Sequence, residues 1–451
     1  MKLGAGKEPS AGTEFASSRN GEFVRYIGAA AIANLTLPIF SIFIPLLAVE
    51  LGASVLEIGI VGGSANLVYS FMPFVMGHFS DRAGARRYFI AGSLAILSAV
   101  SVLYFMVSDP ITLIAIRLFE GLGWATYWPA LEAALTHDPS RDPRKSLTIF
   151  NYSWSGAAAV GPLIGSFLVL ALSLRLVFLS AAMLLIGITL ANFLPILLNR
   201  KAPEKPQGEV QSGLNSTALN GEQTDGPSIF DERQNGRKVS WVFYFIAMAL
   251  CAVSSGILLT FFPPYVKSLG LSILLIGAAP AVYGGVRFLV YLLTVRNGFR
   301  YFLLRRETRA RNTLALLAML SLSSLLLTIP DKSGVIFCVS FGIVGAGYSG
   351  IYYISQVAML AEARSERMGA GAGLFESAIG VGAATGPVAA GIFSGSSPTA
   401  PFLVPSLVLA PALITLLLVS SSAWRGNKGA VGKGRLKSTK TKKPPGPQIP
   451  Q

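Results

Sequence analysis

Long runs of apolar residues, separated by short polar segments, cover most of the 451-residue chain. A helix that crosses the hydrocarbon core of a membrane needs about 20 predominantly apolar residues. The runs predict twelve such helices, whose ends are defined to within a few residues. They lie at about 25–50, 57–79, 87–108, 110–136, 147–172, 175–198, 239–266, 272–296, 311–330, 333–361, 370–395 and 400–424.

The composition supports this interpretation. Apolar residues make up 52% of the chain and charged residues 13%, which is about half the charged share of soluble proteins. Such a chain has too little charge to cover a water-exposed surface, so we predict an all-α integral membrane protein. The two cysteines, Cys251 and Cys338, lie inside apolar runs. They indicate small buried side chains rather than a disulfide framework or a metal site.

The predicted helices fall into two sets of six. The first bundle occupies 25–198 and the second 239–424, and a segment at 199–238 that is rich in Pro, Gly and charge separates them. Its composition predicts a disordered linker. The chain would begin with a polar tail at 1–24, without a signal-peptide pattern, and end with a basic tail at 425–451.

Lysine and arginine concentrate on one side of the predicted helices. The polar segments with Arg82, Arg86 and Arg87, the linker, the 296–311 segment and the basic tail share that side. Because Lys and Arg are enriched in cytoplasmic segments, both termini are expected in the cytoplasm of a multi-pass plasma-membrane protein. The formal net charge of +15 is then explained by topology and contact with lipid, so no nucleic-acid partner is expected. We expect a monomer.

The two sets of helices share an internal repeat. EGLGWATYWPALEAAL, which starts at Glu120, aligns with VGAGYSGIYYISQVAML, which starts at Val344. One helix later, GPLIG at Gly161 matches GPVAAG at Gly386 with nearly the same offset. Repeated six-helix halves are typical of secondary transporters, which bind their substrate between the halves near the bilayer midplane.

Three short motifs carry a resemblance to the twelve-helix type of the major facilitator superfamily, and the third of them is an element that this family associates with antiporters such as drug/proton antiporters. GHFSDRAGARR resembles the family's loop between helices 2 and 3. RLFEGLGWA, which starts at Arg117, resembles the Arg-x-x-x-Gly element of helix 4, and Gly161-Pro162-x-x-Gly165 resembles the Gly-Pro element of helix 5. The resemblance implies two six-helix bundles related by pseudo-two-fold symmetry. In the loop the matching residues are Gly77, Asp81, Arg82, Gly84, Arg86 and Arg87.

The resemblance implies that this loop is a conformational latch on the cytoplasmic side. Asp81 would face the start of helix 11, where an anion interacts favourably with a helix N-terminus. The arginines would pair across the gap between the halves, and Gly77 and Gly84 would permit close approach. A simpler interpretation is that the arginines only enforce topology, which leaves Asp81 and the glycines without a role.

Charged residues inside the predicted helices are candidates for proton coupling. Arg117 and Glu120 lie one turn apart, and two interpretations stay open. They form either a static internal pair, or a pair in which Glu120 takes up and releases a proton while Arg117 stabilises its anion. Glu376 occupies the position that matches Asn151 in the repeat and is a second proton-site candidate.

A substrate cavity is expected where the aromatic residues of the two halves meet, because large amphipathic rings suit flat, cationic or sugar-like molecules. Arg287 would either bind an anionic substrate or bridge helices. The Gly-Pro elements, with Gly161, Pro162, Gly165, Gly386 and Pro387, predict helix bends. The residues expected around the cavity are Trp124, Tyr127, Trp128, Asn151, Tyr152, Arg287, Tyr348 and Tyr352.

These features predict a secondary active transporter that works by alternating access. Our first hypothesis is proton-coupled efflux of a small amphipathic compound; the alternative is proton-coupled import of a sugar or organic anion. A transporter-like membrane sensor is the hypothesis from another class. No catalytic constellation and no GxxxxGK[ST] nucleotide-binding motif occurs in the sequence, so we expect neither enzymatic activity nor a cofactor. We expect that a proton gradient supplies the energy for transport.

Overall fold

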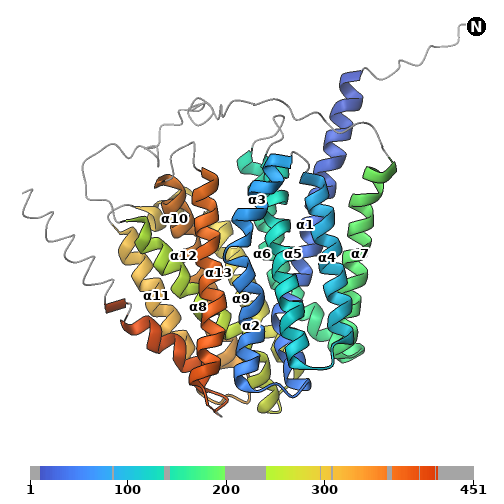
Figure 1. Ribbon diagram of the computed structural model, residues 1–451. Coiled ribbons are helices and arrows are strands. Elements are labelled where there is room, and N and C mark those ends of the chain that lie inside the picture. Colours follow the sequence, from blue (N-terminus) through green and yellow to red (C-terminus); the bar gives the residue numbers. More distant parts are fainter. Residues whose placement is uncertain are drawn as a thin grey trace, which may run out of the picture.

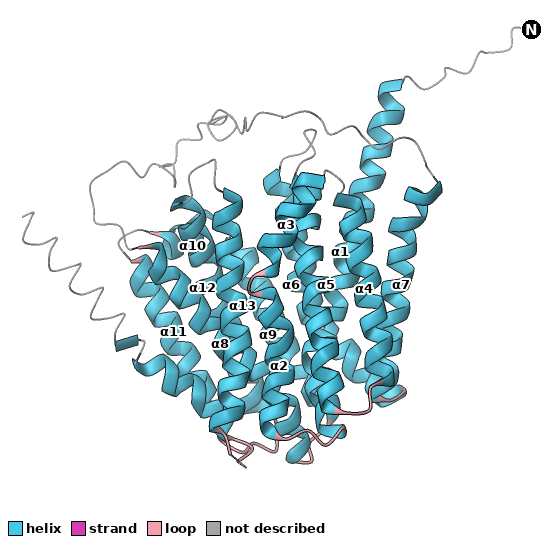
Figure 2. Cartoon of the chain, viewed as in Figure 1, coloured by secondary structure: helices cyan, strands magenta, loops and turns pink. Residues whose placement is uncertain are grey.

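The computed structural model describes the chain over 11–83, 86–136, 143–198, 240–294, 296–305, 308–362, 368–395, 397–411 and 413–414. These residues form helices that run side by side through one bundle, without any strand (Figures 1 and 2). The first half contains α1 (Ala11–Glu50), α2 (Val55–Tyr69), α3 (Met72–Ala83), α4 (Arg86–Met106), α5 (Pro110–Thr136), α6 (Pro143–Ala171) and α7 (Leu174–Leu198). The second contains α8 (Trp241–Ser268), α9 (Ile273–Thr294), α10 (Asn297–Leu304), α11 (Arg309–Leu326), α12 (Val335–Glu362), α13 (Met368–Phe393) and the short helix η2 (Ala400–Phe402).

The first eleven predicted spans each coincide with described helix, with three differences in detail. Helix α1 begins at Ala11, inside the predicted polar tail. The second span is divided into α2 and α3, because Pro73 has no N–H to donate to the carbonyl of Tyr69. Helix α10 lies in a segment where no helix was predicted.

In the described part of the chain eight helical spans are long and apolar enough to cross a membrane, and one of them, Val55–Ser80, runs through α2 and α3. Of the twelfth predicted span, a short apolar helix at Ala400–Pro411 is described. The linker at 199–238 and the tail at 425–451 lie outside the described residues. The total of twelve spanning helices therefore stays a prediction.

The two halves use the same helix pairs. In the first half α1 packs on α6, α2 on α5 and α4 on α5; in the second half α8 packs on α13, α9 on α12 and α11 on α12. Between the halves, α2 packs on α13 and α6 packs on α9. Each pair occupies the matching place in its six-helix order, so the sequence repeat corresponds to a repeat of helix packing.

Matching glycines mark the matching contacts. A Cβ atom on Gly121 would lie 2.3 Å from the carbonyl oxygen of Ala65 on α2, and one on Gly345 would lie 2.6 Å from that of Tyr283 on α9. Gly123 and Gly347, each two residues further on, face leucines of α4 and α11 instead. A side chain at Gly121 or Gly345 would press on backbone atoms and separate the two helices, whereas one at Gly123 or Gly347 would first displace a leucine side chain.

The chain turns in the same way at the start of each half. Leu51-Gly52-Ala53-Ser54 joins α1 to α2, and Leu269-Gly270-Leu271-Ser272 joins α8 to α9. Gly52 and Gly270 have φ values of +78° and +67°, which favour glycine because it has no Cβ. Ser54 then caps α2 through a capping box with Glu57, and the backbone N–H of Leu274 donates to Ser272.

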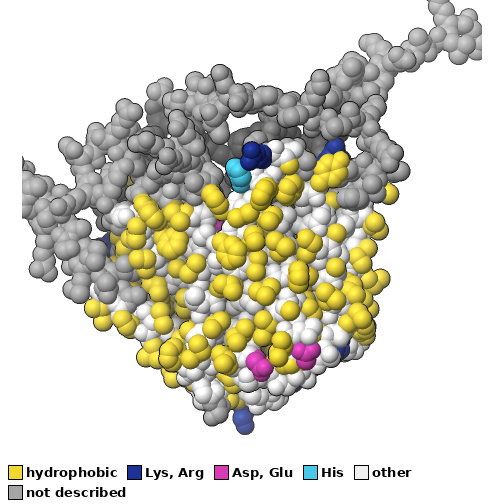
Figure 3. All heavy atoms as spheres, viewed as in Figure 1, with side chains coloured by type: hydrophobic (Ala, Val, Ile, Leu, Met, Phe, Trp, Pro, Cys, Tyr) yellow, Lys and Arg dark blue, Asp and Glu magenta, His cyan; other side chains and the backbone are white. Residues whose placement is uncertain are grey.

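We call the face of the bundle that holds these two turns the turn side, and the face where α1 begins the terminal side. Figure 3 shows exposed apolar side chains over the height of the bundle between these faces, which fits a protein embedded in lipid. Exposed apolar residues include Phe167 on α6, Met183 on α7 and Phe393 on α13.

The halves are in backbone contact on the turn side. A Cβ atom on Gly63 would lie 2.4 Å from the carbonyl oxygen of Ala384 on α13, and one on Gly277 would lie 2.4 Å from that of Pro162 on α6. At the edge of this contact, Lys267 forms an ion pair of 3.6 Å with Glu50. We call the α2–α13 and α6–α9 contacts the seam.

Candidate substrate cavity

Two adjoining chambers lie between the halves. The Arg287 chamber, of about 230 Å³, reaches from Pro45 and Thr260 to Arg287. The Glu376 chamber, of about 200 Å³, continues past Glu120 to Glu376. Each is smaller than the roughly 300–1,000 Å³ of sites for drug-sized ligands, which favours a small substrate. The residues that line both chambers are Leu37, Ser41, Asn66, Arg117, Trp154, Tyr348 and Ile379.

Arg287 on α9 is the cation of the first chamber. Its guanidinium carbon lies 3.9 Å from the ring centroid of Trp154 and 4.4 Å from that of Tyr348. Its Nη1 donates to the hydroxyl of Tyr283 at 2.9 Å, whereas its Nε and Nη2 are buried and have no hydrogen-bond partner. No described carboxylate forms an ion pair with it.

The local sequence explains how Arg287 reaches this place. Tyr283 lies one turn before it on the same face of α9. Gly284 allows α6 to approach, because a Cβ atom there would lie 2.2 Å from the backbone of Ala158. Trp154 lies one turn before Ala158 on α6, so this close approach brings its ring over the guanidinium.

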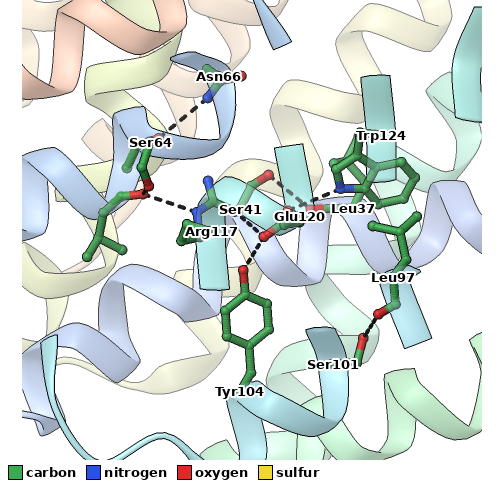
Figure 4. A network of polar contacts seen from close by, with 12 residues as sticks. Leu37, Ser41, Ser64, Asn66, Leu97, Ser101, Tyr104, Arg117, Glu120 and Trp124 are labelled. Carbon is green, nitrogen blue, oxygen red and sulfur yellow. Dashed lines mark hydrogen bonds and ion pairs between the residues drawn. The ribbon is translucent and has the colours of Figure 1, made fainter. Parts of the chain in front are cut away.

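Arg117 and Glu120 on α5 form a compact network with their neighbours (Figure 4). Arg117 forms an ion pair with Glu120 and donates from Nε to the carbonyl of Val61 at 3.1 Å. Glu120 also accepts hydrogen bonds from the hydroxyl of Tyr104 and, at 3.1 Å, from Nε1 of Trp124. The Glu120 carboxyl group therefore has three donors.

In this network the positive charge of Arg117 compensates the negative charge of Glu120. The side chains of Arg117 and Glu120 are almost completely buried, and breaking such a pair leaves an uncompensated charge. The geometry fits the static interpretation of the pair better than proton exchange at Glu120. The cation that remains available in the first chamber is then Arg287.

Glu376 on α13 lines the second chamber. Its Oε2 accepts a hydrogen bond of 3.1 Å from the hydroxyl of Tyr69 on α2, so this bond joins the two halves. Glu132 of α5 lines the same chamber, together with Trp124, Trp128, Phe150 and Tyr352. The second chamber is thus aromatic and acidic, in contrast to the cationic first chamber.

Some residues that were expected at the cavity lie elsewhere. Tyr127 is fully buried and packs against Trp124 and Trp128, and Tyr152 packs against Phe288; neither lines a chamber. The side chain of Asn151 lies outside the described residues. Trp124, Trp128, Arg287, Tyr348 and Tyr352 do line the cavity.

Sequence reasoning missed Tyr69, Tyr104 and Tyr283, all of which make polar contacts with charged residues of the cavity. Tyr283 carried a usable signal, because it precedes Arg287 by one helical turn. Tyr69 and Tyr104 reach Glu376 and Glu120 from distant positions in the chain, and spacing along one helix does not reveal such contacts.

The expected latch is described in part. Gly84 lies outside the described residues, as does the side chain of Asp81. Arg82 is exposed, Arg86 donates to the carbonyl of Ala133 at 3.4 Å, and the guanidinium of Arg87 lies 5.3 Å from the ring centroid of Tyr88. A Cβ atom on Gly77 would contact Pro129 at 3.5 Å. These contacts remain within the first half, so the latch stays a prediction.

The Gly-Pro elements lie where helices pack. A Cβ atom on Gly161 would lie 3.0 Å from the carbonyl oxygen of Leu35, and one on Gly165 would lie 2.4 Å from the ring of Phe43, both on α1. Gly386 faces Val253 on α8 in the same way. Helices α6 and α13 continue through Pro162 and Pro387, so these elements bring helices together without ending them.

Known proteins provide an independent comparison. A family model described as Major Facilitator Superfamily matches residues 26–337. A glycerol-3-phosphate transporter of Bacillus subtilis is 30% identical over 175 residues, which cover 37% of each chain. A probable hexose phosphate transport protein of Chlamydia trachomatis is 34% identical over 110 residues, which cover 23% of each chain. The chain therefore matches well under half the length of these curated relatives.

Solved structures show the fold. The nucleoside transporter NupG superimposes with a TM-score of 0.64 at 14% identity, over 89% of this chain and 98% of that one. A bacterial homologue of the human lysosomal transporter Spinster gives 0.63 at 15% identity, over 90% and 96%. Together with the family match and the repeated helix packing, this establishes that the chain belongs to the Major Facilitator Superfamily and is a multi-pass membrane protein.

Proposed function

We propose that the protein takes up a small organic phosphate anion by alternating access, with Arg287 as the anion-binding residue and a proton gradient as the driving force. The observation that carries the proposal is the unpaired cation of Arg287 in the cavity between the halves. A buried charge without a counter-ion is costly and marks a functional site by default. A substrate anion supplies the missing counter-ion.

The chemistry of the guanidinium group supports a phosphate or carboxylate substrate. Arginine presents its donors as a planar fork that pairs with two oxygens at once. In Arg287, Nε and Nη2 lie on one edge of that plane and both lack a partner. The stacked rings of Trp154 and Tyr348 hold the plane in place, so little side-chain freedom is lost on binding.

The relatives favour the organic-anion alternative over our first hypothesis of efflux. The names of the Bacillus and Chlamydia proteins refer to glycerol-3-phosphate and hexose phosphate. Both substrate classes combine a phosphate with a small hydroxylated body. Hydroxyl groups would find partners such as Asn66 and Ser41 in the Arg287 chamber, and the modest size of this chamber suits them.

Arg287→Gln is expected to weaken organic phosphate binding by roughly 10- to 100-fold, because a hydrogen bond to a charged group contributes about 1.5–3 kcal/mol. The measurement is counterflow of radiolabelled glycerol 3-phosphate and glucose 6-phosphate in proteoliposomes, with glycerol and glucose as neutral probes. Arg287→Lys keeps the charge without the fork and is expected to fall between wild type and Arg287→Gln.

Lys332→Gln is the matched control, because it also removes one positive charge but lies exposed on the turn side. It is expected to leave counterflow unchanged. The proposal would be contradicted if the wild type showed saturable counterflow of neither glycerol 3-phosphate nor glucose 6-phosphate. Full activity of Arg287→Gln in a well-folded preparation would contradict it as well.

A further inference from the structure

The second chamber contains carboxyl groups for which substrate binding at Arg287 gives no explanation. Glu120 forms an ion pair with Arg117 and accepts hydrogen bonds from Tyr104 and Trp124. Among the described residues, Glu376 instead accepts a hydrogen bond of 3.1 Å from the hydroxyl of Tyr69. Both Glu376 and Glu132 border the chamber, and their carboxyl groups interact electrostatically.

The cation that lines the Glu376 chamber, Arg117, is paired with Glu120, and the other groups around Glu376 are acidic or neutral. Among the described residues, no Lys, Arg or His forms an ion pair with it. Helix α3, which also contacts α13, carries His78 and Arg82, and both are exposed. The titratable and charged groups on the packed elements that face this region are Tyr69 on α2, Arg117, Glu120 and Glu132 on α5, Tyr291 on α9, and Tyr348 and Tyr352 on α12.

A carboxylate in this setting is stabilised by one hydrogen bond and repelled by a second carboxyl group. Glu376 is half-buried, and removing an ionised carboxylate from water without a counter-ion costs more free energy than removing the neutral acid. Uptake of a proton removes that cost, and the neutral group still accepts the bond from Tyr69. A proton is thus the simplest ligand that this site can bind.

The charges of the two chambers link the proton to the substrate. The Arg117–Glu120 pair is neutral, and Arg287 supplies one positive charge. An organic phosphate carries about 1.5–2 negative charges at neutral pH, which exceeds that single positive charge. An anionic Glu376 in the adjoining chamber would repel the excess, so substrate and proton each favour binding of the other.

We propose that Glu376 binds the coupling proton and releases it as the halves rearrange, so that a proton and an organic phosphate cross the membrane together; this rests on the function proposed above. Tyr69 belongs to the first half and Glu376 to the second. A rocking motion of the halves therefore changes this hydrogen bond in each cycle. The same motion that moves the substrate changes the environment of the proton site.

Glu376→Gln mimics the protonated acid and is expected to uncouple transport. The test uses proteoliposomes at zero membrane potential, with pH 7 outside and pH 8 inside, and radiolabelled glycerol 3-phosphate. If one proton moves with each substrate, a gradient of about one pH unit supports about tenfold accumulation by the wild type. Glu376→Gln is expected to retain counterflow and to lose this accumulation. An entrapped pH dye should report proton entry with substrate in the wild type and not in Glu376→Gln.

Three further variants distinguish a role of Glu376 in proton coupling from a purely structural role. Glu57→Gln removes an exposed carboxylate from α2 and should keep accumulation. Tyr69→Phe removes the bond but keeps the acid, and should remain proton-driven with an altered rate. Glu376→Asp restores an acid if Glu376→Gln fails to fold, and should respond to the gradient.

Two results would overturn the inference, and they are distinguishable. Tenfold accumulation by Glu376→Gln with intact counterflow would exclude Glu376 as the proton site and leave the proposed substrate standing. Absence of counterflow of glycerol 3-phosphate and glucose 6-phosphate in the wild type would reject the proposed function, and the inference with it.

Discussion

Arg117→Met is expected to destabilise the protein by about 3–5 kcal/mol, because it leaves the anionic Glu120 buried without its cation. Glu120→Gln is expected to be costly for the reverse reason, since Arg117 would then be left unpaired. The double variant should recover most of the loss, because it removes both charges. In the double variant the amide oxygen at position 120 is expected to accept from Nε1 of Trp124, and the amide N–H to donate to the hydroxyl of Tyr104, because the two groups contact different oxygens of Glu120.

The differences in stability among these variants are measured by thermal unfolding of the purified protein in detergent, with tryptophan fluorescence as the signal. The coupling between the two substitutions is the decisive quantity. A static pair predicts strong coupling in stability and unchanged proton dependence of transport in Glu120→Gln. Independent, additive losses would show that the pair does not stabilise the fold. A loss of proton dependence would return Glu120 to the coupling mechanism.

Gly63→Val is expected to shift the protein out of the conformation in which the seam is closed. A Cβ atom there overlaps the backbone oxygen of Ala384, which a change of side-chain rotamer cannot relieve. Overpacking of this kind costs about 1–3 kcal/mol, equivalent to a change of roughly 5- to 150-fold in the conformational equilibrium.

Distances between paired spin labels measure this shift. Labels at Ser108 and Lys332, one on the turn side of each half, should move apart in Gly63→Val, whereas labels at Tyr88 and Tyr301 on the terminal side should approach. Gly187→Val on α7 is the control, because a Cβ atom at Gly187 meets nothing within 4 Å. Unchanged distances in Gly63→Val would show that the close approach of α2 and α13 does not hold the seam.

Much of this architecture is predictable from the sequence, because the membrane permits few solutions. Apolar length sets the spans, and only helices satisfy the backbone of separate segments in lipid. The internal repeat then predicts equivalent packing, as the facing of Gly121 and Gly345 toward α2 and α9 confirms. The division between α2 and α3 was missed although Pro73 marks it, because hydropathy averages over such a local break.

The site was less predictable than the fold. Aromatic residues of α5 and α12 were expected in the cavity, but Tyr127 is fully buried, because one helix presents rings to its neighbours as well as to the cavity. The roles of Arg287 and Glu120 depended on partners from other helices, which no pattern along one chain segment reveals. Arg287 proved to lack an acidic partner among the described residues, and Glu120 to have three donors.

Our central claim is that the seam must open for transport. The ion pair of 3.6 Å between Glu50 and Lys267 joins the halves at its edge. Cysteines at these two positions, with Cys251 and Cys338 replaced by serine, allow a short reversible thiol crosslink from α1 to α8, which joins the two halves on the turn side. The account predicts that the crosslink abolishes counterflow of glycerol 3-phosphate and that reduction restores it. Full counterflow by the crosslinked protein would contradict it.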